Sequence, residues 1–284
     1  MRSKVRCIVL LSLAVAMACL CWNLIVRTSS SPAVKGKDAD AYTQFADAFS
    51  AEDTSLMNAT LWEFTQTLEE ANITYFMIEG TLLGSYRHLD RIPWDDDVDL
   101  AVNVADKENV TELFRNSTSH TLMNVYGGGE HWKFFPKDGH PISGRAFRSP
   151  FIDIFWYDEN ASHIFYTSPQ LQFKVRKSDL FPLRRRPFGE FLLPAPCNTT
   201  AYLSAASFWV DQCVSRHLNH LNVNPMTSRT VPCSRLTDIY PFVSRQQQLT
   251  NSSKTIVVES QIFNGTVVKQ WSYEDDGCTP AVQS

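Results

Sequence analysis

Four aspartates fall within five positions of one short segment: Asp95, Asp96, Asp97 and Asp99. Apolar residues precede this cluster and alternate with its last members, which indicates a buried strand rather than a solvated turn. In an extended segment Asp95, Asp97 and Asp99 would share one face, because successive side chains point to opposite sides. Three carboxylates this close repel one another unless a cation lies among them. Mg²⁺ and Mn²⁺ prefer such oxygen ligands and commonly hold phosphate as well, so the cluster predicts a metal-dependent enzyme with a phosphate-bearing substrate.

A glycine turn precedes the cluster. The β-branched and aromatic run at residues 73–78 predicts a buried strand that ends at Gly80. Thr81 then begins a short expected helix that reaches His88. The backbone N–H groups of a glycine turn at the start of a helix are suited to bind phosphate.

One more carboxylate stands alone in an apolar strand. Residues 151–156 read FIDIFW and contain Asp153. Burying an unpaired charge is costly, and a metal ion shared with Asp97 and Asp99 would give Asp153 a partner. An Asp-x-Asp pair on one strand and a third carboxylate on a neighbouring strand predict the layout of a nucleotidyltransferase.

Three other interpretations of the aspartates compete with this one. An EF-hand calcium loop is excluded, because its sixth position needs glycine and Leu100 stands there. A Golgi glycosyltransferase that binds a nucleotide sugar through a DxD motif would need a βαβ unit before the aspartates. Only about forty residues separate Asp53 from the motif, room for one helix and one strand, and this function is kept as the alternative. A non-catalytic glycan-binding scaffold is the second alternative.

Four segments resemble a known family. GTLLGSYRH at residues 80–88, followed by IPWDDDVDL at 92–100, is similar to the signature of the LicD and fukutin family. FIDIFW is similar to the strand of that family that carries the third aspartate. LFPLRRRPFGEFLLPAP at 180–196 resembles a downstream block, so that the likeness covers about residues 54–202.

The resemblance implies an α+β fold, a nucleotidyltransferase-like mixed β-sheet flanked by helices. It implies transfer of an alcohol phosphate, of the ribitol phosphate or phosphocholine type, from a CDP-linked donor onto a glycan or glycoprotein acceptor. Asp97 and Asp99 would bind the catalytic Mg²⁺ or Mn²⁺, Asp153 would be the third ligand or the base, and Asp95 an auxiliary ligand. The residues that would shape the phosphate-binding turn are Gly80, Thr81 and Gly84.

Basic residues near these motifs are candidates for binding the substrate. Arg87 and His88 lie one short helix from the aspartates and would reach phosphate, although Arg87 is equally suited to pair with an aspartate. Arg184 belongs to a second basic cluster, for which a solvated loop is the other interpretation. Lys133 and Arg145 lie on expected strands beside the site.

The N-terminus has the pattern of a membrane anchor. Residues 7–26 form an uncharged, largely apolar run of 20 residues, about the length that spans a bilayer. Basic residues at 1–6 would stay cytosolic, which predicts a type II Golgi membrane protein with a lumenal catalytic domain. A cleaved signal peptide, with location in the endoplasmic reticulum or secretion, is the alternative. We expect a stem at 27–52, the catalytic domain at 53–221 and a disulfide-linked C-terminal extension at 222–284.

Sequons and cysteines agree with a lumenal chain. Four cysteines follow the apolar run, Cys197, Cys213, Cys233 and Cys278, and an oxidising compartment predicts two disulfides in one of three pairings, with a zinc site as the alternative. Eight glycosylation sequons are present, at Asn58, Asn72, Asn109, Asn116, Asn160, Asn198, Asn251 and Asn264.

Composition and periodicity supply the remaining expectations. The chain has 284 residues, of which 44% are apolar, and its net charge of −4 makes nucleic acid an improbable partner. Oligomers are compatible with the sequence. The spacing of Met57, Leu61, Phe64 and Leu68 predicts a helix capped by Ser50 or Asp53, and residues 202–218 predict another. No periodicity assigns the region after residue 222.

Overall fold

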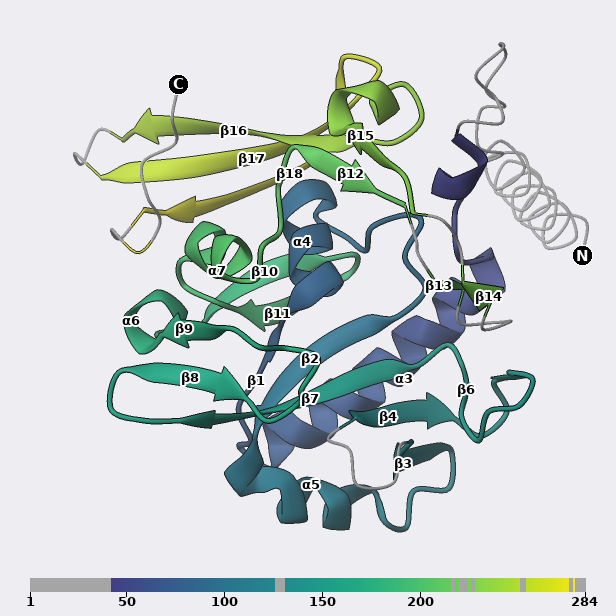
Figure 1. Ribbon diagram of the computed structural model, residues 1–284. Coiled ribbons are helices and arrows are strands. Elements are labelled where there is room, and N and C mark those ends of the chain that lie inside the picture. Colours follow the sequence, from purple (N-terminus) through teal and green to yellow (C-terminus); the bar gives the residue numbers. More distant parts are fainter. Residues whose placement is uncertain are drawn as a thin grey trace, which may run out of the picture. The chain divides into compact units, whose positions relative to one another are not determined.

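A mixed β-sheet stands at the centre of the computed structural model (Figure 1). The structure describes residues 42–125, 131–215, 218–219, 224–225, 228–250, 254–275 and 278. Its seven-stranded sheet has the order β1-β2-β7-β4-β3, and β8 and β9 continue from β7. β2 and β7 are parallel, whereas the other pairs are antiparallel. The strands are β1 (Tyr75–Met77), β2 (Val98–Asn103), β3 (His120–Asn124), β4 (His131–Pro136), β7 (Ile152–Glu159), β8 (His163–Tyr166) and β9 (Lys174–Arg176).

The helix α3 (Ala51–Glu70) covers one face of this sheet (Figure 1). Ser50 caps it and Asp53 bonds back to the backbone of Ser50, a capping box that satisfies two N–H groups at the helix start. All four apolar residues predicted to share one face are buried. Phe64 packs on Phe134 of β4, with ring centroids 5.1 Å apart. The predicted helix and its cap are therefore confirmed.

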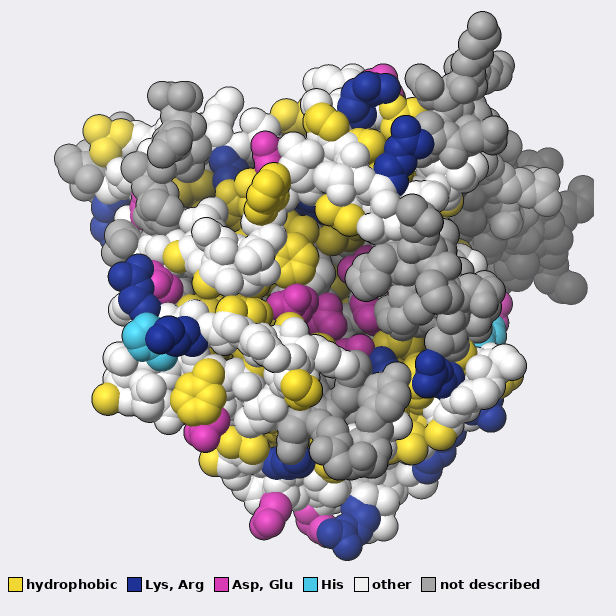
Figure 2. Space-filling model, viewed as in Figure 1, with side chains coloured by type: hydrophobic (Ala, Val, Ile, Leu, Met, Phe, Trp, Pro, Cys, Tyr) yellow, Lys and Arg dark blue, Asp and Glu magenta, His cyan; other side chains and the backbone are white. Residues whose placement is uncertain are grey.

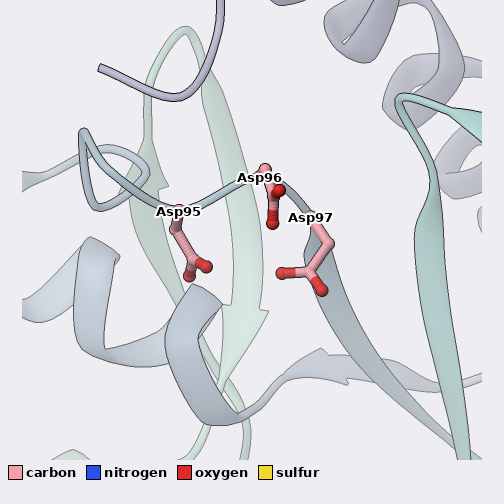
Figure 3. Close-up of side chains that lie close together, drawn as sticks. All are labelled: Asp95, Asp96 and Asp97. Carbon is pink, nitrogen blue, oxygen red and sulfur yellow. The ribbon is translucent and has the colours of Figure 1, made fainter. Parts of the chain in front are cut away.

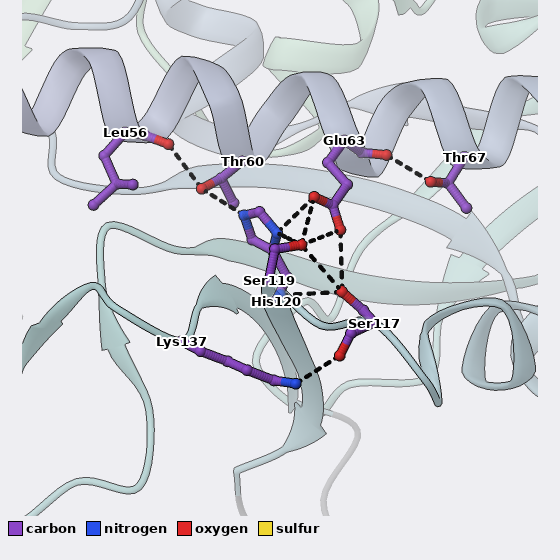
Figure 4. Close-up of polar contacts among 8 residues, drawn as sticks. All are labelled: Leu56, Thr60, Glu63, Thr67, Ser117, Ser119, His120 and Lys137. Carbon is purple, nitrogen blue, oxygen red and sulfur yellow. Dashed lines mark hydrogen bonds and ion pairs between the residues drawn. The ribbon is translucent and has the colours of Figure 1, made fainter.

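A polar network fastens α3 to β3 (Figure 4). The carboxylate of Glu63 accepts hydrogen bonds from the hydroxyls of Ser117 and Ser119 and lies 2.8 Å from Nδ1 of His120. Nε2 of His120 lies 3.2 Å from the hydroxyl of Thr60, one turn earlier on the same helix. Each buried polar atom thus has a partner, which makes this network a structural clamp.

The remaining elements surround the sheet. Short helices are η1 (Thr43–Phe45), α4 (Glu79–His88), η2 (Val104–Asp106), α5 (Lys107–Phe114), α6 (Lys177–Leu180), α7 (Thr199–Ala205) and η3 (Cys233–Leu236). Short strand pairs are β5 (His140–Pro141) with β6 (Arg148–Ser149), β10 (Arg184–Phe188) with β11 (Phe191–Ala195), β12 (Gln212–Val214) with β15 (Thr230–Pro232), and β13 (Leu218–Asn219) with β14 (Asn224–Pro225). The mixed α+β class predicted from the sequence is confirmed, and so are the expected strands at 73–78 and 151–156.

The helix predicted at 202–218 is wrong in extent. α7 ends at Ala205, where the amide of Phe208 bonds back to the carbonyl of Leu203 at 2.8 Å. Ser207 takes φ of 62°, a left-handed conformation that stops a helix. The chain then enters β12 instead.

The unassigned C-terminal region forms an antiparallel sheet of β16 (Phe242–Leu249), β17 (Thr255–Phe263) and β18 (Thr266–Glu274). Glu259 of β17 is fully buried and pairs with Arg186 and Arg245, at 2.8 and 2.9 Å. A buried carboxylate with two guanidinium partners is compensated, and the pair with Arg186 joins this sheet to β10.

Both expected disulfides are present, as Cys197–Cys278 and Cys213–Cys233. The four cysteines that follow the apolar run are thereby paired with one another, and the zinc alternative is not supported. Each disulfide restricts the conformations available to the unfolded chain and so stabilises the folded state.

The N-terminal part of the described chain packs on the core. Phe45 is buried, and its ring packs edge to face on Trp94. The carbonyl of Phe45 accepts a hydrogen bond from the hydroxyl of Tyr240. Phe45 falls in the range 27–52 that we assigned to the stem. The predicted membrane span at 7–26 lies outside the described residues, and within those residues no helix has the length and apolarity to cross a bilayer.

Candidate active site

A cleft of about 700 Å³ opens where β2 begins, beside the N-terminal end of α4. Its lining includes Gly80, Asp95, Asp97 and Asp99. Figure 2 shows the acidic side chains gathered at the hollowed centre of this face, bordered by hydrophobic ones. The cleft is therefore negative at its base and apolar at its rim.

The parallel pairing of β2 and β7 brings three carboxylates together. Asp99 and Asp153 are direct neighbours in the register, so their side chains leave the sheet on the same face. Asp97 immediately precedes β2, and one carboxylate oxygen of each of the three residues lies within 4.8 Å of the others. All three side chains are buried. The grouping proposed from the sequence is the grouping that the fold produces.

A second group contains Asp95, Asp96 and Asp97, whose ligand atoms also lie within 4.8 Å of one another. Their side chains project to the same side of the loop that leads into β2 (Figure 3). Strand alternation would have turned Asp96 away from the others. That expectation is wrong because the strand begins only at Val98, and Asp96 lines the cleft.

The chemistry of this donor set fits a divalent cation. Burial raises the pKa of Asp99 well above its usual range, and the charges of Asp97, Asp153, Asp95 and Glu79 raise it further, in that order. The carboxylates therefore cannot all be ionised without a compensating positive charge. Oxygen-only ligands of this kind suit Mg²⁺ or Mn²⁺.

Asp153 already has a partner from the protein. Nζ of Lys133 lies 2.5 Å from its Oδ1, and the two residues are cross-strand neighbours on β4 and β7. The lysine is itself buried, with its ammonium 3.6 Å from the ring centroid of Phe151. The expectation that Asp153 needs a metal ion as its partner is wrong, because a lysine from an adjacent strand supplies the charge.

The start of α4 lies against the aspartates. A Cβ at Gly80 would come within 2.5 Å of Oδ2 of Asp95, so only glycine permits this close approach. The hydroxyl of Thr81 accepts the backbone N–H of Asp99 at 2.7 Å and so positions the strand. Gly84 faces backbone instead, since its Cβ would meet the carbonyl of Asp90 at 2.6 Å. Of the three turn residues predicted to bind phosphate, only Gly80 lines the cleft.

Glu79 is a residue that the sequence analysis missed. It lines the cleft next to Gly80 and takes φ of 44°, an uncommon conformation for a residue with a side chain. Burial raises its pKa to about 7. The sequence signal that could have identified Glu79 is its position immediately before the glycine turn.

Arg87 is the one basic residue in the described lining of the cleft. Its guanidinium donates to the carbonyl of Gln212 at 3.0 Å and lies 3.3 Å from Sγ of Cys233. Burial lowers its pKa to about 10, and the charge of Asp95 partly opposes this shift. Arg87 therefore joins the aspartate motif to the segment that follows α7.

Two predicted substrate-binding residues are not brought to the aspartates. His88 is buried at the far end of α4, about 12 Å along the helix from Gly80. It packs on Phe242 and contacts the carbonyl of Pro241 through Nδ1 at 2.9 Å, and burial lowers its pKa to about 3. Arg184 lines a different pocket, where its guanidinium faces the ring of Tyr273.

The mixed sheet, the glycine turn and the carboxylates on two parallel strands have the layout predicted for a nucleotidyltransferase domain. Residues 72–198 match the LicD/FKTN/FKRP nucleotidyltransferase domain. This segment belongs to the LicD/FKTN/FKRP nucleotidyltransferase domain family.

Three relatives illustrate the likeness. The mouse ribitol-5-phosphate transferase FKTN is 27% identical over 143 residues, 49% of this chain and 30% of that protein. The mouse ribitol 5-phosphate transferase FKRP is 28% identical over 151 residues, 48% of this chain and 28% of that protein. The lipopolysaccharide cholinephosphotransferase LicD of Haemophilus influenzae is 30% identical over 104 residues, 34% of this chain and 39% of that protein. The chain thus spans less than a third of each of the two animal proteins.

Proposed function

We propose that this protein is a metal-dependent transferase that moves an alcohol phosphate from a CDP-linked donor onto a glycan acceptor. The observation that carries the proposal is the set of Asp97, Asp99 and Asp153, with ligand atoms within 4.8 Å, inside the segment that matches the family. The relatives are named for transferring ribitol phosphate or phosphocholine, and both groups are alcohol phosphates. The shared chemistry supports the phosphotransferase over a nucleotide-sugar glycosyltransferase or a scaffold.

Mg²⁺ or Mn²⁺ would be held by Asp97, Asp99 and Asp153, with Asp95 as an auxiliary ligand. When bound, the ion supplies positive charge against the charge that develops on the transferring phosphate. The N–H groups at the start of α4 then face the donor phosphates across Gly80. Arg87, the basic residue of the described cleft lining, would add a further donor to these phosphates.

The acceptor hydroxyl attacks the distal phosphorus of the donor in line with the departing CMP. A new bond forms between this oxygen and phosphorus, and the bond from phosphorus to the CMP oxygen breaks. Asp153, which Lys133 holds in position at 2.5 Å, or another carboxylate of the cluster accepts the proton of the hydroxyl.

We further propose a type II Golgi membrane protein, anchored by residues 7–26. Sequons at Asn72, Asn109, Asn116, Asn160 and Asn264 are exposed and so accessible to glycosylation. Asn58 and Asn198 are partly buried and make hydrogen bonds within the fold, while Asn251 lies outside the described residues. Two disulfides agree with a lumenal location.

A thermal-shift series tests the donor class. The protein is heated with CDP, CDP-ribitol, CDP-choline or UDP-sugars, each with Mn²⁺ and with a chelator. We expect only the CDP-linked ligands to raise the melting temperature, and only with Mn²⁺, because binding to the folded state alone stabilises it. A shift with UDP-sugars alone would favour the glycosyltransferase, and no shift with any nucleotide would favour the scaffold.

A further inference from the structure

Part of the cleft lining lies outside the segment that matches the family. Residues 207–209, Gln212, Val214, Ser215 and Thr230 line the cleft, and all of them follow residue 198, where the match ends. We name these residues the second wall. The aspartates and Gly80 lie inside the matched segment. The cleft is therefore assembled from a part that the relatives share and a part for which the family match gives no counterpart.

The second wall differs from the acidic wall in chemistry. None of its members carries an ionisable side chain; they are aromatic, aliphatic, hydroxyl and amide groups. The acidic wall offers Glu79 and the aspartates. A donor phosphate belongs beside the metal ligands, so an uncharged ligand with an apolar face is what fits the second wall.

Trp209 is the most exposed large side chain of this wall, with 71% of its surface accessible. A solvent-exposed indole at the edge of a cleft offers a flat apolar surface on which a flat or cyclic ligand can stack. Phe208 lies next to it and lines the same cleft.

The backbone around Trp209 is held in place. The left-handed Ser207 precedes it, and the disulfide Cys213–Cys233 follows. Nε1 of Trp94 donates to the carbonyl of Val214 at 2.9 Å. Arg87 bonds the carbonyl of Gln212 at 3.0 Å, so two side chains of the shared motif anchor this wall at a constant place relative to the aspartates. Such preorganisation lowers the entropy cost of binding a ligand there.

We infer that Trp209, with Phe208 beside it, stacks a neutral sugar ring of the acceptor glycan and thereby selects the acceptor. The inference rests on the proposed function. The matched segment carries what the relatives have in common, whereas the printed name of the bacterial relative adds an acceptor of its own, lipopolysaccharide. Selection of the acceptor needs residues that differ between relatives, and the second wall, which lines the cleft beyond the match, offers such residues. The electron-rich face of an indole suits the C–H face of a sugar, and Gln212 and Thr230 offer partners for its hydroxyls.

Binding measurements on the full chain test this inference. Wild type, Trp209→Ala, Trp209→Phe and the control Trp62→Ala are titrated with two probes: CMP in Mn²⁺, and an array of neutral oligosaccharides. Trp62 is a matched control because it is 59% exposed but lies on α3 and lines a different pocket. We expect Trp209→Ala to weaken the best oligosaccharide about tenfold, Trp209→Phe to retain most of the affinity, and Trp62→Ala to retain all of it. The affinity for CMP should change less than twofold in every variant.

Three results would overturn the inference. They are an unchanged oligosaccharide affinity in Trp209→Ala, a parallel loss of CMP affinity that would assign the indole to the nucleobase, and a wild type that binds CMP but no oligosaccharide. A failure of the proposed function would look different, as absence of CMP binding by the wild type in Mn²⁺. If oligosaccharide binding still required Trp209 in that case, the sugar subsite would be supported and the proposed transferase activity would be refuted.

Discussion

Asparagine at position 99 should make the protein more stable without metal and insensitive to it. Asp99 is buried, and its ligand atom lies within 4.8 Å of those of Asp97 and Asp153. Asparagine keeps the shape of the side chain and removes its charge. The substitution therefore separates the repulsion within the cluster from the packing around it.

The magnitude follows from the geometry. Two unit charges 4.8 Å apart repel by about 3.5 kcal/mol at an effective dielectric constant of about 20. The native state avoids part of this cost by keeping a proton on Asp99, since the pKa of this carboxyl is raised. We therefore expect a gain of about 2 kcal/mol at neutral pH, or roughly 4–8 °C for a chain of this size.

The sign of the pH dependence is defined as well. Because the folded pKa of Asp99 lies above the unfolded one, its contribution to stability is complete below pH 4 and is lost as the pH rises through the folded pKa. Asparagine does not titrate. The difference in melting temperature between wild type and Asp99→Asn should therefore grow as the pH is raised.

Differential scanning fluorimetry between pH 5 and pH 8, in EDTA and across an Mn²⁺ titration, measures both effects. Asp158→Asn is the matched control, since Asp158 lies on the same strand as Asp153 but is exposed. The control should melt like the wild type in every condition. The reasoning is refuted if Asp99→Asn follows the wild-type pH profile in EDTA, or if Mn²⁺ stabilises it as much as the wild type.

Three further predictions concern the surroundings of the cluster. Lys133→Met leaves Asp153 buried without its cation, which should lower the melting temperature in EDTA by an amount equivalent to about 3 kcal/mol. Mn²⁺ should restore part of this loss, and an equal loss with and without Mn²⁺ would contradict the pairing. Gly80→Ala should weaken Mn²⁺ binding with little change in melting temperature, whereas Gly84→Ala, whose methyl group would meet backbone atoms, should destabilise the fold by about 1–3 kcal/mol. Calorimetry measures Mn²⁺ binding and fluorimetry measures the melting temperature of both variants. If the two variants changed in the same way, both predictions would be contradicted. Burial lowers the pKa of His88 to about 3, so as the pH falls the unfolded state binds a proton before the folded state does. The free energy of unfolding should therefore decrease by about 1.4 kcal/mol for each pH unit below pH 6.5. Urea denaturation at pH 7.5 and pH 5 checks this slope, which His88→Gln should reduce; an unchanged slope would argue against neutral burial.

Local patterns in the sequence were sufficient for several elements. The spacing of Met57, Leu61, Phe64 and Leu68 predicted α3, because a helix repeats its buried positions every three to four residues. The strand carrying Asp153 followed from its apolar, β-branched composition. Where a short-range pattern ended in an unfavourable backbone conformation, as at Ser207, the prediction of a helix failed.

Contacts between distant segments were beyond these patterns. The pairing of Lys133 with Asp153 depends on the register of β4 against β7, which no local signal specifies. The disulfide partners could not be chosen among three pairings until the fold placed the cysteines. His88 stands next to Arg87 in the sequence, yet the turn of the helix directs one to the cleft and the other into the core.

The sequence by itself determined the chemistry that is present: a cluster of carboxylates beside a glycine turn, with one more aspartate held in an apolar strand. These are properties of residue type and short spacing, and they survive without knowledge of the fold. Only the tertiary structure decided which groups meet, because parallel pairing of β2 with β7 sets Asp99 opposite Asp153, and the segment that follows α7 brings Trp209 to the same cleft. Such proximity arises from the packing of the whole chain, and no single segment specifies that packing.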